Sequence, residues 1–375
     1  MDLIKFSEDL SAGLTEAELI TGATSIAWIE RYRDSGEFEI VAPVSSGLRT
    51  SLPEGCYISH LDTYEVMVVE NHEISDEKAS ETEIVITGRS LETILNQRII
   101  GSNITWPATV GTELTDYLVG SNKTWDQIFA LIHAHINPAY LIDNDDAFPN
   151  ILPVLDVVKT AGDSIARYAK RDELHEYLLT LLDIDDLGLK TMRPGPWTTH
   201  GDDVTTSIVI HDGVDKTADV AFSYDEGEIE SGEYLWSNKN LKTSALVTGK
   251  WMQTIVHGTE DEYARRVMYV DGSDIDEDYD VAPTAGAQQT AVLASMTIRG
   301  QEALAAQNHV AVENVEIAKN SVRHAYRTDY NIGDLVMVEG NYDEETTMRV
   351  IEYVEIEDEK GEHNYPTLAS IEEED

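Results

Sequence analysis

Alternating apolar and polar residues predict a β-hairpin near the start of the chain. Every second residue of positions 24–33 falls on one face of a strand, with Trp28 in the alternation and Glu30 continuing it. Asp34-Ser35-Gly36 supplies a turn, and strand-forming residues resume over 38–43. Two such runs around a short loop that contains glycine are typical of a hairpin.

The same kind of pattern predicts a second pair of strands and then a helix. Residues 64–72 and 81–88 are strand-like and flank a polar loop. Ser90 stands where it can cap a helix, and one apolar stripe at helical spacing follows it with Leu91, Ile94 and Leu95. The first ~100 residues therefore predict a small β-barrel or sandwich that ends in a helix.

The following part of the chain favours helices. Thr124-Trp125-Asp126-Gln127 has the form of a capping box, and the helix that it starts would end at Pro138. Residues 160–182 show a second helical pattern. Arg193-Pro194-Gly195-Pro196 is the clearest breaker in the chain and predicts a domain boundary.

Strand patterns return after Asp203 and are interrupted once by a helix. An Ala-rich helix is predicted over 288–307, with Gly300 at a close approach to a neighbouring element. The strands predicted around it are 205–212, 220–224, 232–238, 242–256, 263–271, 310–318, 334–339 and 347–356. Because strands lie on both sides of the helix, the sequence indicates an α+β fold, mostly β, with a discontinuous second β-domain.

The balance of charges is extreme. The chain contains 71 acidic and 26 basic residues, which gives a formal net charge of −45. Self-repulsion of this size destabilises a compact state in dilute buffer, whereas molar salt shortens the Debye length to about 3 Å and screens it. Two interpretations stay open, an ordinary acidic protein and a protein adapted to high salt. The charge argues against nucleic-acid binding, which needs clustered Lys and Arg.

Neither the cysteine content nor the hydropathy suggests a disulfide or a membrane anchor. Cys56 is alone, so no disulfide can form within the chain, and we expect a small buried apolar side chain. No stretch approaches the ~20 apolar residues of a membrane span, and the N-terminus does not resemble a signal peptide.

The sequence contains no strong catalytic or metal-binding motif. It lacks the phosphate-binding GxxxxGK, the GxSxG elbow and a GxGxxG that follows a strand. His133 and His135 precede the acidic run 143–146, but side chains at i and i+2 of a helix point in different directions. Aromatic residues at strand spacing are more often core than a sugar platform, and this applies to Tyr234, Trp236 and Trp251. We therefore expect no enzyme activity and no cofactor.

One acidic loop partly matches a calcium-binding pattern. Asp274, Asp276 and Asp278 mimic the first three ligands of an EF-hand, but Tyr279 replaces its required glycine. We interpret this segment as a solvated acidic loop that attracts cations loosely.

Several segments together resemble a known family. The N-terminal WIERYRDSGEFEIVAPV, the passage ITGRSLETILNQRI and the late HAYRTDYNIGDLVMVEG occur in an order and spacing that resemble the tail-hub (baseplate hub) proteins of long-tailed, siphovirus-type viruses. The resemblance extends from about residue 24 to about residue 368. The positions that match the family pattern, with a structural role implied for each, are Trp28, Gly36, Gly88, Arg89, Leu91, Arg98, Gly333 and Asp334.

The resemblance implies roles for some of these positions. Gly36 would permit a turn with positive φ, and Gly333-Asp334 would start a strand. Arg89 and Arg98 would pair with carboxylates at domain or subunit contacts.

The resemblance also implies an architecture of two small, tube-type β-barrel modules and a peripheral helical or α+β domain. Residues 1–102 would form the first barrel. Residues 103–195 would form the peripheral domain, joined by about 257–308. The second, discontinuous barrel would consist of 196–256 and 309–375.

The implied function is structural. Three copies would form a hub in the virion, at the distal end of the tail, where it adapts a sixfold tube to a threefold tip and gates DNA passage. The implied partners are a second and third copy, the distal tail or tube ring, the tape-measure protein and a tip or fibre protein, without specific nucleic-acid binding. The alternatives are a receptor- or carbohydrate-binding tail-tip module and a secreted hydrolase of a halophile. The acidity suggests a host that lives in brine.

Overall fold

The computed structural model describes most of the chain. The described residues are 1–6, 18–75, 82–101, 117–120, 122–141, 151–160, 164, 167–169, 172–193, 206–237, 241–258, 265–276, 282–283, 286–305, 310–319, 323–340 and 345–370. Asp278, the acidic run 143–146 and the breaker residues 194–196 lie outside them.

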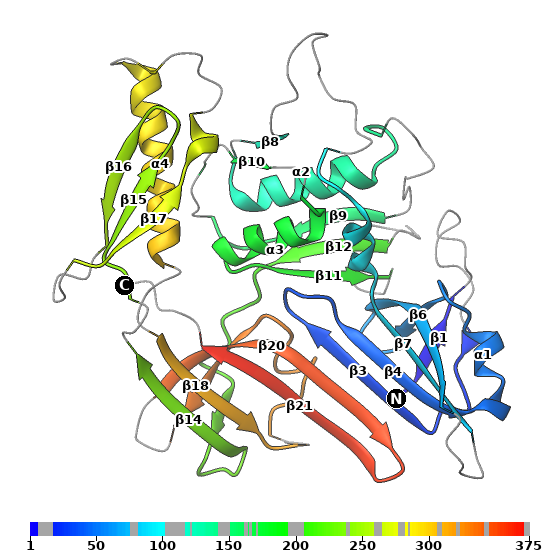
Figure 1. Cartoon of the computed structure of the whole chain (residues 1–375). Coiled ribbons are helices and arrows are strands. Elements are labelled where there is room, and N and C mark those ends of the chain that lie inside the picture. Colours follow the sequence, from blue (N-terminus) through cyan, green and yellow to red (C-terminus); the bar gives the residue numbers. More distant parts are fainter. Residues whose placement is uncertain are drawn as a thin grey trace.

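One large sheet of thirteen strands runs along the lower part of the molecule (Figure 1). Its N-terminal half contains β1 (Leu3–Lys5), β2 (Glu18–Leu19), β3 (Ser25–Arg31), β4 (Glu37–Pro43), β5 (Tyr57–His60), β6 (Val66–Ser75) and β7 (Glu83–Ser90). Its C-terminal half contains β13 (Ala221–Ser223), β14 (Ile229–Ser237), β18 (Val310–Ile317), β19 (Leu335–Glu339), β20 (Glu345–Asp358) and β21 (Gly361–Ser370).

The two halves meet where β3 pairs with β20. The strand order is β14-β18-β21-β20-β3-β4-β7-β6-β5-β1-β2, with β19 and β13 branching from β20. Among the described strands this path is open at β14 and β2. The short helices η2 (Val44–Ser46) and α1 (Leu48–Ser51) cover one end of the N-terminal half.

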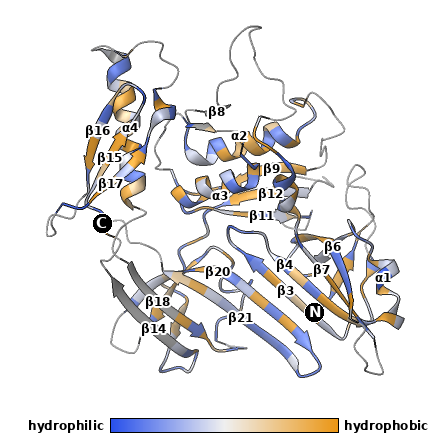
Figure 2. Ribbon diagram, in the orientation of Figure 1, coloured by the Kyte–Doolittle hydropathy of each residue, from blue (hydrophilic) through white to orange (hydrophobic). Residues whose placement is uncertain are grey.

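The predicted alternation explains how each half is packed. Burial in β3 alternates strictly, with Ile26, Trp28 and Glu30 turned inward. The resulting apolar stripes of β3, β4 and β7 face one core (Figure 2). The C-terminal half packs a separate core around Phe222, Val336 and Val350.

An α/β unit lies above the large sheet. Its three-stranded sheet has the order β11 (Gly188–Met192), β12 (Thr206–His211) and β9 (Ile151–Asp156), and β8 (Tyr117–Gly120) pairs with β10 (Arg167–Ala169). Helices α2 (Thr124–Ile136) and α3 (Leu174–Ile184) bury their apolar faces against it. The 3-10 helix η3 (Leu91–Gln97) contributes to the same core, so it links this unit to the first strands.

A third unit consists of one helix on a small sheet. The sheet has the order β16 (Gln253–His257), β15 (Ser244–Thr248) and β17 (Val267–Asp271). Helix α4 (Ala287–Ala305) covers one face, and η5 (Ser273–Ile275) follows β17. The close approach predicted at Gly300 is confirmed, because a Cβ there would lie 2.6 Å from Cγ2 of Val256.

The predicted α+β, mostly β class is confirmed, and four local predictions are wrong in whole or in part. Ser90 ends β7 with extended φ and ψ and makes no side-chain cap, and the helix after it is 3-10. Lys123 rather than Thr124 is the N-cap of α2. The helix predicted over 160–182 is confirmed only in its second part, as α3, because the strand β10 precedes it. The single strand predicted over 242–256 is the hairpin β15–β16.

Tertiary contacts explain these differences. Thr124 already lies in the first turn of α2, and its hydroxyl accepts a hydrogen bond from Arg167 at 3.4 Å. The strand predicted over 205–212 is β12, which pairs with β9 and β11 and not with the large sheet. No helix among the described residues is long and apolar enough to cross a membrane.

Candidate functional site: the seam between the two halves of the large sheet

Strands β3 and β20 form the contact that unites the two halves. Their antiparallel register pairs Trp28 with Glu355 and Glu30 with Tyr353. Backbone hydrogen bonds therefore join segments from opposite ends of the sequence. We call this strand pair, with the side chains packed on it, the β3–β20 seam.

Glu30 lies buried at the seam and accepts three hydrogen bonds. The donors are Nε1 of Trp28 at 3.3 Å, the hydroxyl of Tyr326 at 2.5 Å and Nη2 of Arg327 at 3.2 Å. Arg327 also pairs with Glu355 at 2.5 Å, so one guanidinium holds carboxylates of both strands. A buried charge is stable only when it is paired and hydrogen-bonded, and this network meets that requirement.

Burial and charge together set the protonation states in this network. Desolvation works to lower the pKa of Arg327, but the carboxylates of Glu30 and Glu355 outweigh it and raise that pKa. Burial raises the pKa of Tyr326, so its hydroxyl keeps the proton that it donates to Glu30. Burial lowers the pKa of His60, whose ring packs on Trp28, to about 4. His60 is therefore neutral at pH 7.

A second buried contact attaches the α/β unit to the end of the seam. Tyr32, directly after β3, donates its hydroxyl proton to the carbonyl of Asp186 at 2.9 Å. Arg349 of β20 donates to the carbonyl oxygens of Asp212, at 3.0 Å, and of Gly333. It also pairs with the carboxylate of Asp186. We call Tyr32, Arg349 and Asp186 the junction, because they join β3, β20 and the end of α3.

Gly333 and Asp334 support this junction from the turn before β19. Gly333 has a φ of +91°, and a Cβ on it would lie 2.5 Å from the ring of Tyr32. Asp334 is buried and accepts hydrogen bonds from the backbone amides of Val214 at 2.8 Å and Asn331 at 2.9 Å. Gly333 and Asp334 therefore precede the strand β19, as their position in the sequence indicates. The absence of a side chain at Gly333 also leaves room for the ring of Tyr32.

Two other glycines lie where neighbouring atoms leave no space for a side chain. A Cβ on Gly88 would lie 1.8 Å from the carbonyl oxygen of Val68 on the adjacent strand. The positive φ predicted for Gly36 is wrong, because Gly36 is absent from the left-handed residues of the described chain. Its Cβ would instead lie 2.6 Å from the carbonyl oxygen of Ile29. Close packing, not turn geometry, accounts for glycine at 36.

The remaining positions of the family pattern lie apart from one another. Trp28 and Leu91 are fully buried in two different cores. Arg89 forms a two-pronged pair with Glu70 of the adjacent strand β6, at 2.7 and 2.8 Å. The carbonyl of Arg98 accepts a hydrogen bond from the amide of Leu174 at 2.8 Å, which joins the end of η3 to α3. A carboxylate partner for Arg98 stays a prediction.

In the described part of the acidic loop after β17, which ends at Asp276, the carboxylates of Asp274 and Asp276 are bonded to the protein and not solvated. The carboxylate of Asp276 is fully buried and accepts hydrogen bonds from the amides of Lys250, Trp251 and Met252, at 2.6, 2.8 and 3.1 Å. Asp274 pairs with Arg299 at 3.0 Å. The two carboxylates therefore fix the β15–β16 turn and α4. Within the described residues, no group of three His, Cys, Asp or Glu is placed to hold a metal ion.

The histidine pair and the cysteine have structural partners. His135 is buried, with Nδ1 2.8 Å from the carbonyl of Leu131 and Nε2 accepting from the amide of Gly101 at 3.0 Å. His133 contacts Asn137 instead, so the two rings point in different directions, as predicted. Cys56 is buried, as predicted.

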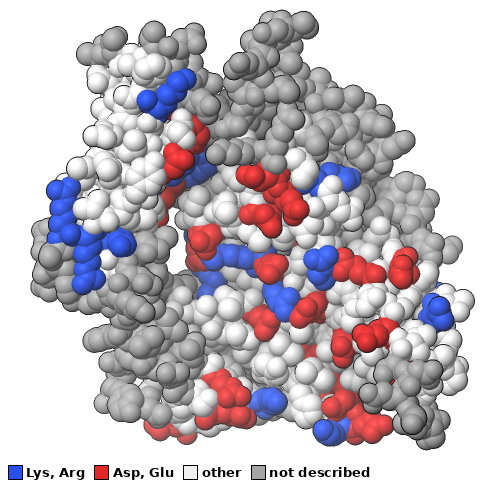
Figure 3. Space-filling view, in the orientation of Figure 1, with Lys and Arg blue, Asp and Glu red and all other residues white. Residues whose placement is uncertain are grey.

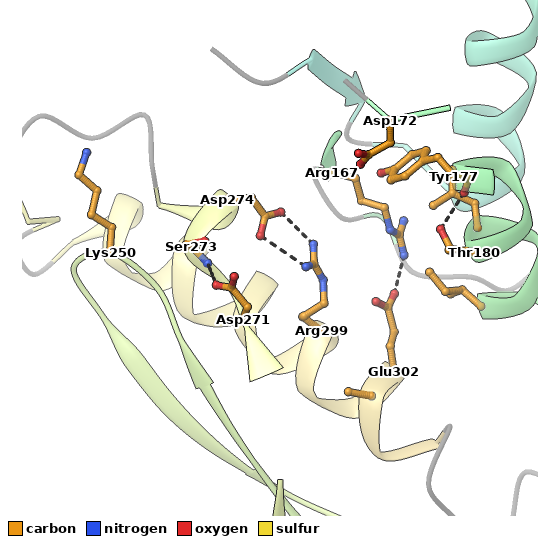
Figure 4. A pocket seen from close by; sticks show the side chains of 13 residues that line it. Arg167, Asp172, Tyr177, Thr180, Lys250, Asp271, Ser273, Asp274, Arg299 and Glu302 are labelled. Carbon is orange, nitrogen blue, oxygen red and sulfur yellow. Dashed lines mark hydrogen bonds and ion pairs between the residues drawn. The ribbon is translucent and has the colours of Figure 1, made fainter. Parts of the chain in front are cut away.

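A cleft of about 840 Å³ lies between α3 and α4 (Figure 4). Arg167 of β10 crosses it to reach Glu302 of α4 at 2.5 Å, and Arg299 reaches Asp274 on its other side. Desolvation raises the pKa of Glu302, although Arg167 opposes this shift. The cleft carboxylates of Glu302 and Asp274 are thus each bound to an arginine. Carboxylates held in this way suit a contact between the two units better than proton transfer to a substrate.

Sequence analysis did not single out Tyr32, Asp186, Arg327, Arg349 or Glu355. Their partners come from distant segments, so no local spacing marks them. The one signal was Glu30, a charged residue at an inward position of the alternation in β3. Such a residue needs a buried partner of opposite charge.

The fold is similar to that of solved proteins described as tail proteins. The tail protein from Neisseria meningitidis MC58 matches with a TM-score of 0.58 at 9% identity, covering 99% of this chain and 96% of that one. The 43 kDa tail protein of prophage MuSo2 from Shewanella oneidensis matches with a TM-score of 0.55 at 13% identity, covering 99% of this chain and 98% of that one. Prophage tail protein gp18 from Listeria monocytogenes EGD-e matches with a TM-score of 0.52 at 12% identity, covering 100% of this chain and 96% of that one.

Sequence comparison gives the family. No curated protein sequence matches the chain. The family model described as Siphovirus ReqiPepy6 Gp37-like protein matches residues 12–367, which is nearly the whole chain. The protein therefore belongs to the Siphovirus ReqiPepy6 Gp37-like family.

Proposed function

We propose that the protein is the structural hub at the distal end of a viral tail, where three copies form a ring that closes the tail tube. The observation that carries this proposal is the β3–β20 seam, which holds two sheet halves with separate cores side by side in one subunit. Three such subunits would present six sheet halves to a sixfold tube and a threefold face to the tip.

The chemistry of the seam supports a load-transmitting role. Charged groups on the two strands are paired with one another, and the junction ties the α/β unit to the same strands. Each of the two arginines pairs with a carboxylate, while the Nε atoms of Arg327 and Arg349 have no hydrogen-bond partner. Buried ion pairs of this kind favour one arrangement of the strands over others. Rigidity at this place would keep the two halves at a fixed angle, as a ring subunit requires.

We further propose that DNA passes through the ring and that the tape-measure protein and a tip or fibre protein bind at its two ends. A chain with a net charge of −45 repels phosphate, so a wall made from it would let DNA pass without binding. In this proposal the protein acts mechanically and is not an enzyme.

The test is the mass of the full chain in molar salt. Multi-angle light scattering on a sizing column should give three times the chain mass of 41.7 kDa, and electron micrographs should show rings with threefold symmetry. Addition of the distal tail ring protein of the same virus should shift the trimer to a larger complex. A monomer that stays monomeric with that ring protein present would contradict the proposal.

A further inference from the structure

The third unit is inserted into the large sheet at one point. Strands β14 and β18 are antiparallel neighbours, and their register pairs Ser237 with Val310. The chain leaves the large sheet after Ser237, forms β15, β16, β17 and α4, and returns at Val310 (Figure 1). The strands of the third unit form a sheet of their own. Because both connections start at the same end of one strand pair, the unit can turn relative to the large sheet without loss of strand pairing.

The third unit and the α/β unit have separate cores with a cleft between them. The described core of the third unit consists of residues between 245 and 304, whereas α3 packs into the core of the α/β unit. The cleft between α3 and α4 measures about 840 Å³. Figure 3 shows the surface hollowed between the two units, with acidic and basic side chains close together there. Two bodies with their own cores, joined at one end and parted by a cleft, are typical of hinge motion.

One ion pair crosses the cleft. Arg167 is fixed on the side of the α/β unit, where it donates hydrogen bonds to the side chains of Thr124 at 3.4 Å and Gln127 at 3.2 Å. Its guanidinium also pairs with the carboxylate of Glu302 on α4 (Figure 4). The two side chains are only 4% and 18% exposed, so solvent screens their attraction little. We call the Arg167–Glu302 pair the latch.

We propose that the latch holds the third unit in a closed arrangement, and that breaking it lets this unit move as a body away from the α/β unit. A buried guanidinium is stable only beside an anion. The other described partners of Arg167, Thr124 and Gln127, are neutral. When Glu302 loses its charge, water must reach Arg167, and opening the cleft admits it. An anion that binds Arg167 in place of Glu302 would favour the open arrangement for the same reason.

The test measures distances between the two units in the full chain. Val158→Cys and Tyr269→Cys allow spin labels on the α/β unit and on the third unit, at side chains that are 73% and 65% exposed. Cys56 is buried, so it should stay unlabelled. Double electron–electron resonance on labelled chain, diluted in an excess of unlabelled chain, reports distances within one subunit whatever the oligomeric state. The chain with an intact latch should give one main distance, that of the closed arrangement.

Two substitutions break the latch from its two sides. Glu302→Gln removes the charge and keeps the size of the side chain. We expect the ratio of a second, open distance to the closed distance to rise at least about tenfold, since a hydrogen bond to a charged group contributes roughly this factor or more. Arg167→Gln should give the same second distance.

The control breaks an ion pair in the same cleft that does not join the two units. Asp274 and Arg299 both belong to the third unit, where their pair connects η5 to α4. Asp274→Asn should therefore leave the distance between the labels unchanged. Circular dichroism melts identify a variant that fails to fold, and the result then rests on the other latch variant.

The outcomes decide the inference independently of the proposed ring. An open distance in every folded latch variant, and none in Asp274→Asn, supports the latch. A closed distance alone in a folded Glu302→Gln or Arg167→Gln chain overturns it. An equal change in Asp274→Asn also overturns it, because loosening of the third unit itself would then explain the new distance. The ring is tested separately by the mass of the wild-type protein.

Discussion

At Gly88, one missing side chain allows two strands to approach closely. A Cβ there would lie 1.8 Å from the carbonyl oxygen of Val68 and 2.7 Å from the ring of Phe38. Gly88→Ala should therefore lower the free energy of unfolding by about 3 kcal/mol, the upper range for overpacking a core. Gly258→Ala is the control, since its Cβ would meet neighbouring atoms only at 3.8 Å or more. Equal urea midpoints for the two variants would contradict the steric explanation.

Glu92 should give the folded state a measurable dependence on pH. It is 1% exposed and accepts a hydrogen bond from the hydroxyl of Thr191 at 2.6 Å. Burial raises its pKa from 4.5 to about 7. Between these values Glu92 is protonated in the folded state and ionised in the unfolded state, so its contribution to stability falls as pH rises from about 4.5 to about 7 and is constant above that.

The variant Glu92→Gln isolates this effect. It cannot ionise, so it should be more stable than the wild type by about 2 to 3 kcal/mol at pH 8 and should lose the advantage near pH 4.5. Urea unfolding at several pH values in molar salt measures the stability difference at pH 8 and its loss near pH 4.5. Glu39→Gln on the exposed side of β4 is the control. Parallel profiles of stability against pH for Glu92→Gln and the wild type would show that Glu92 is not the source of the pH dependence.

At the scale of elements, one carboxylate fixes a hairpin turn. Asp276 accepts hydrogen bonds from three consecutive amides of the β15–β16 turn. Asp276→Ala leaves these donors without their acceptor and should destabilise the third unit by about 2 kcal/mol. Hydrogen exchange at residues 250–252 should accelerate, while exchange at the β3–β20 seam stays unchanged. The control is Asp271→Ala, whose carboxylate accepts from Ser273. Unchanged exchange at the turn would contradict this role.

The junction gives a prediction for a whole contact between elements. Arg349 is 5% exposed and binds Asp186, Gly333 and Asp212 at once. Arg349→Met leaves the buried carbonyls of Gly333 and Asp212 without this donor, while Asp186 keeps its pair with Arg33, and should cost about 2 to 3 kcal/mol. Arg89→Met breaks an exposed pair with Glu70 and should cost less than about 1 kcal/mol. Similar thermal shifts for the two variants would show that the junction is not a central contact.

The elements also show how far the sequence alone could go. Alternation located β3, β4, β6 and β7, because one face of each is buried and the period of a strand is two residues. It could not reveal that 205–212 joins β9, or that Thr124 binds Arg167, since both depend on segments far away in the chain. The seam network was missed for the same reason. Only Glu30, charged at an inward position, pointed to it.

At the scale of the whole molecule, charge decides the conditions under which the fold is stable. The net charge of −45 is spread along the chain, whereas the described ion pairs involve few of the 71 carboxylates. We propose that the protein is adapted to high salt. Raising KCl from about 0.1 M to about 2 M should raise the melting temperature by roughly 5 °C or more, because screening shortens the range of repulsion from about 10 Å to less than 3 Å.

The shape of this salt dependence separates the two interpretations of the charge. An ordinary acidic protein loses most of its long-range repulsion by about 0.2 M salt, so its melting temperature should level off there. A protein adapted to brine should continue to gain stability above 1 M, where only repulsion between adjacent carboxylates is left to screen. Calorimetric melts in NaCl and KCl, at equal ionic strength, test this. A plateau below 0.2 M in both salts would contradict salt adaptation, while the seam and the junction would keep their structural roles.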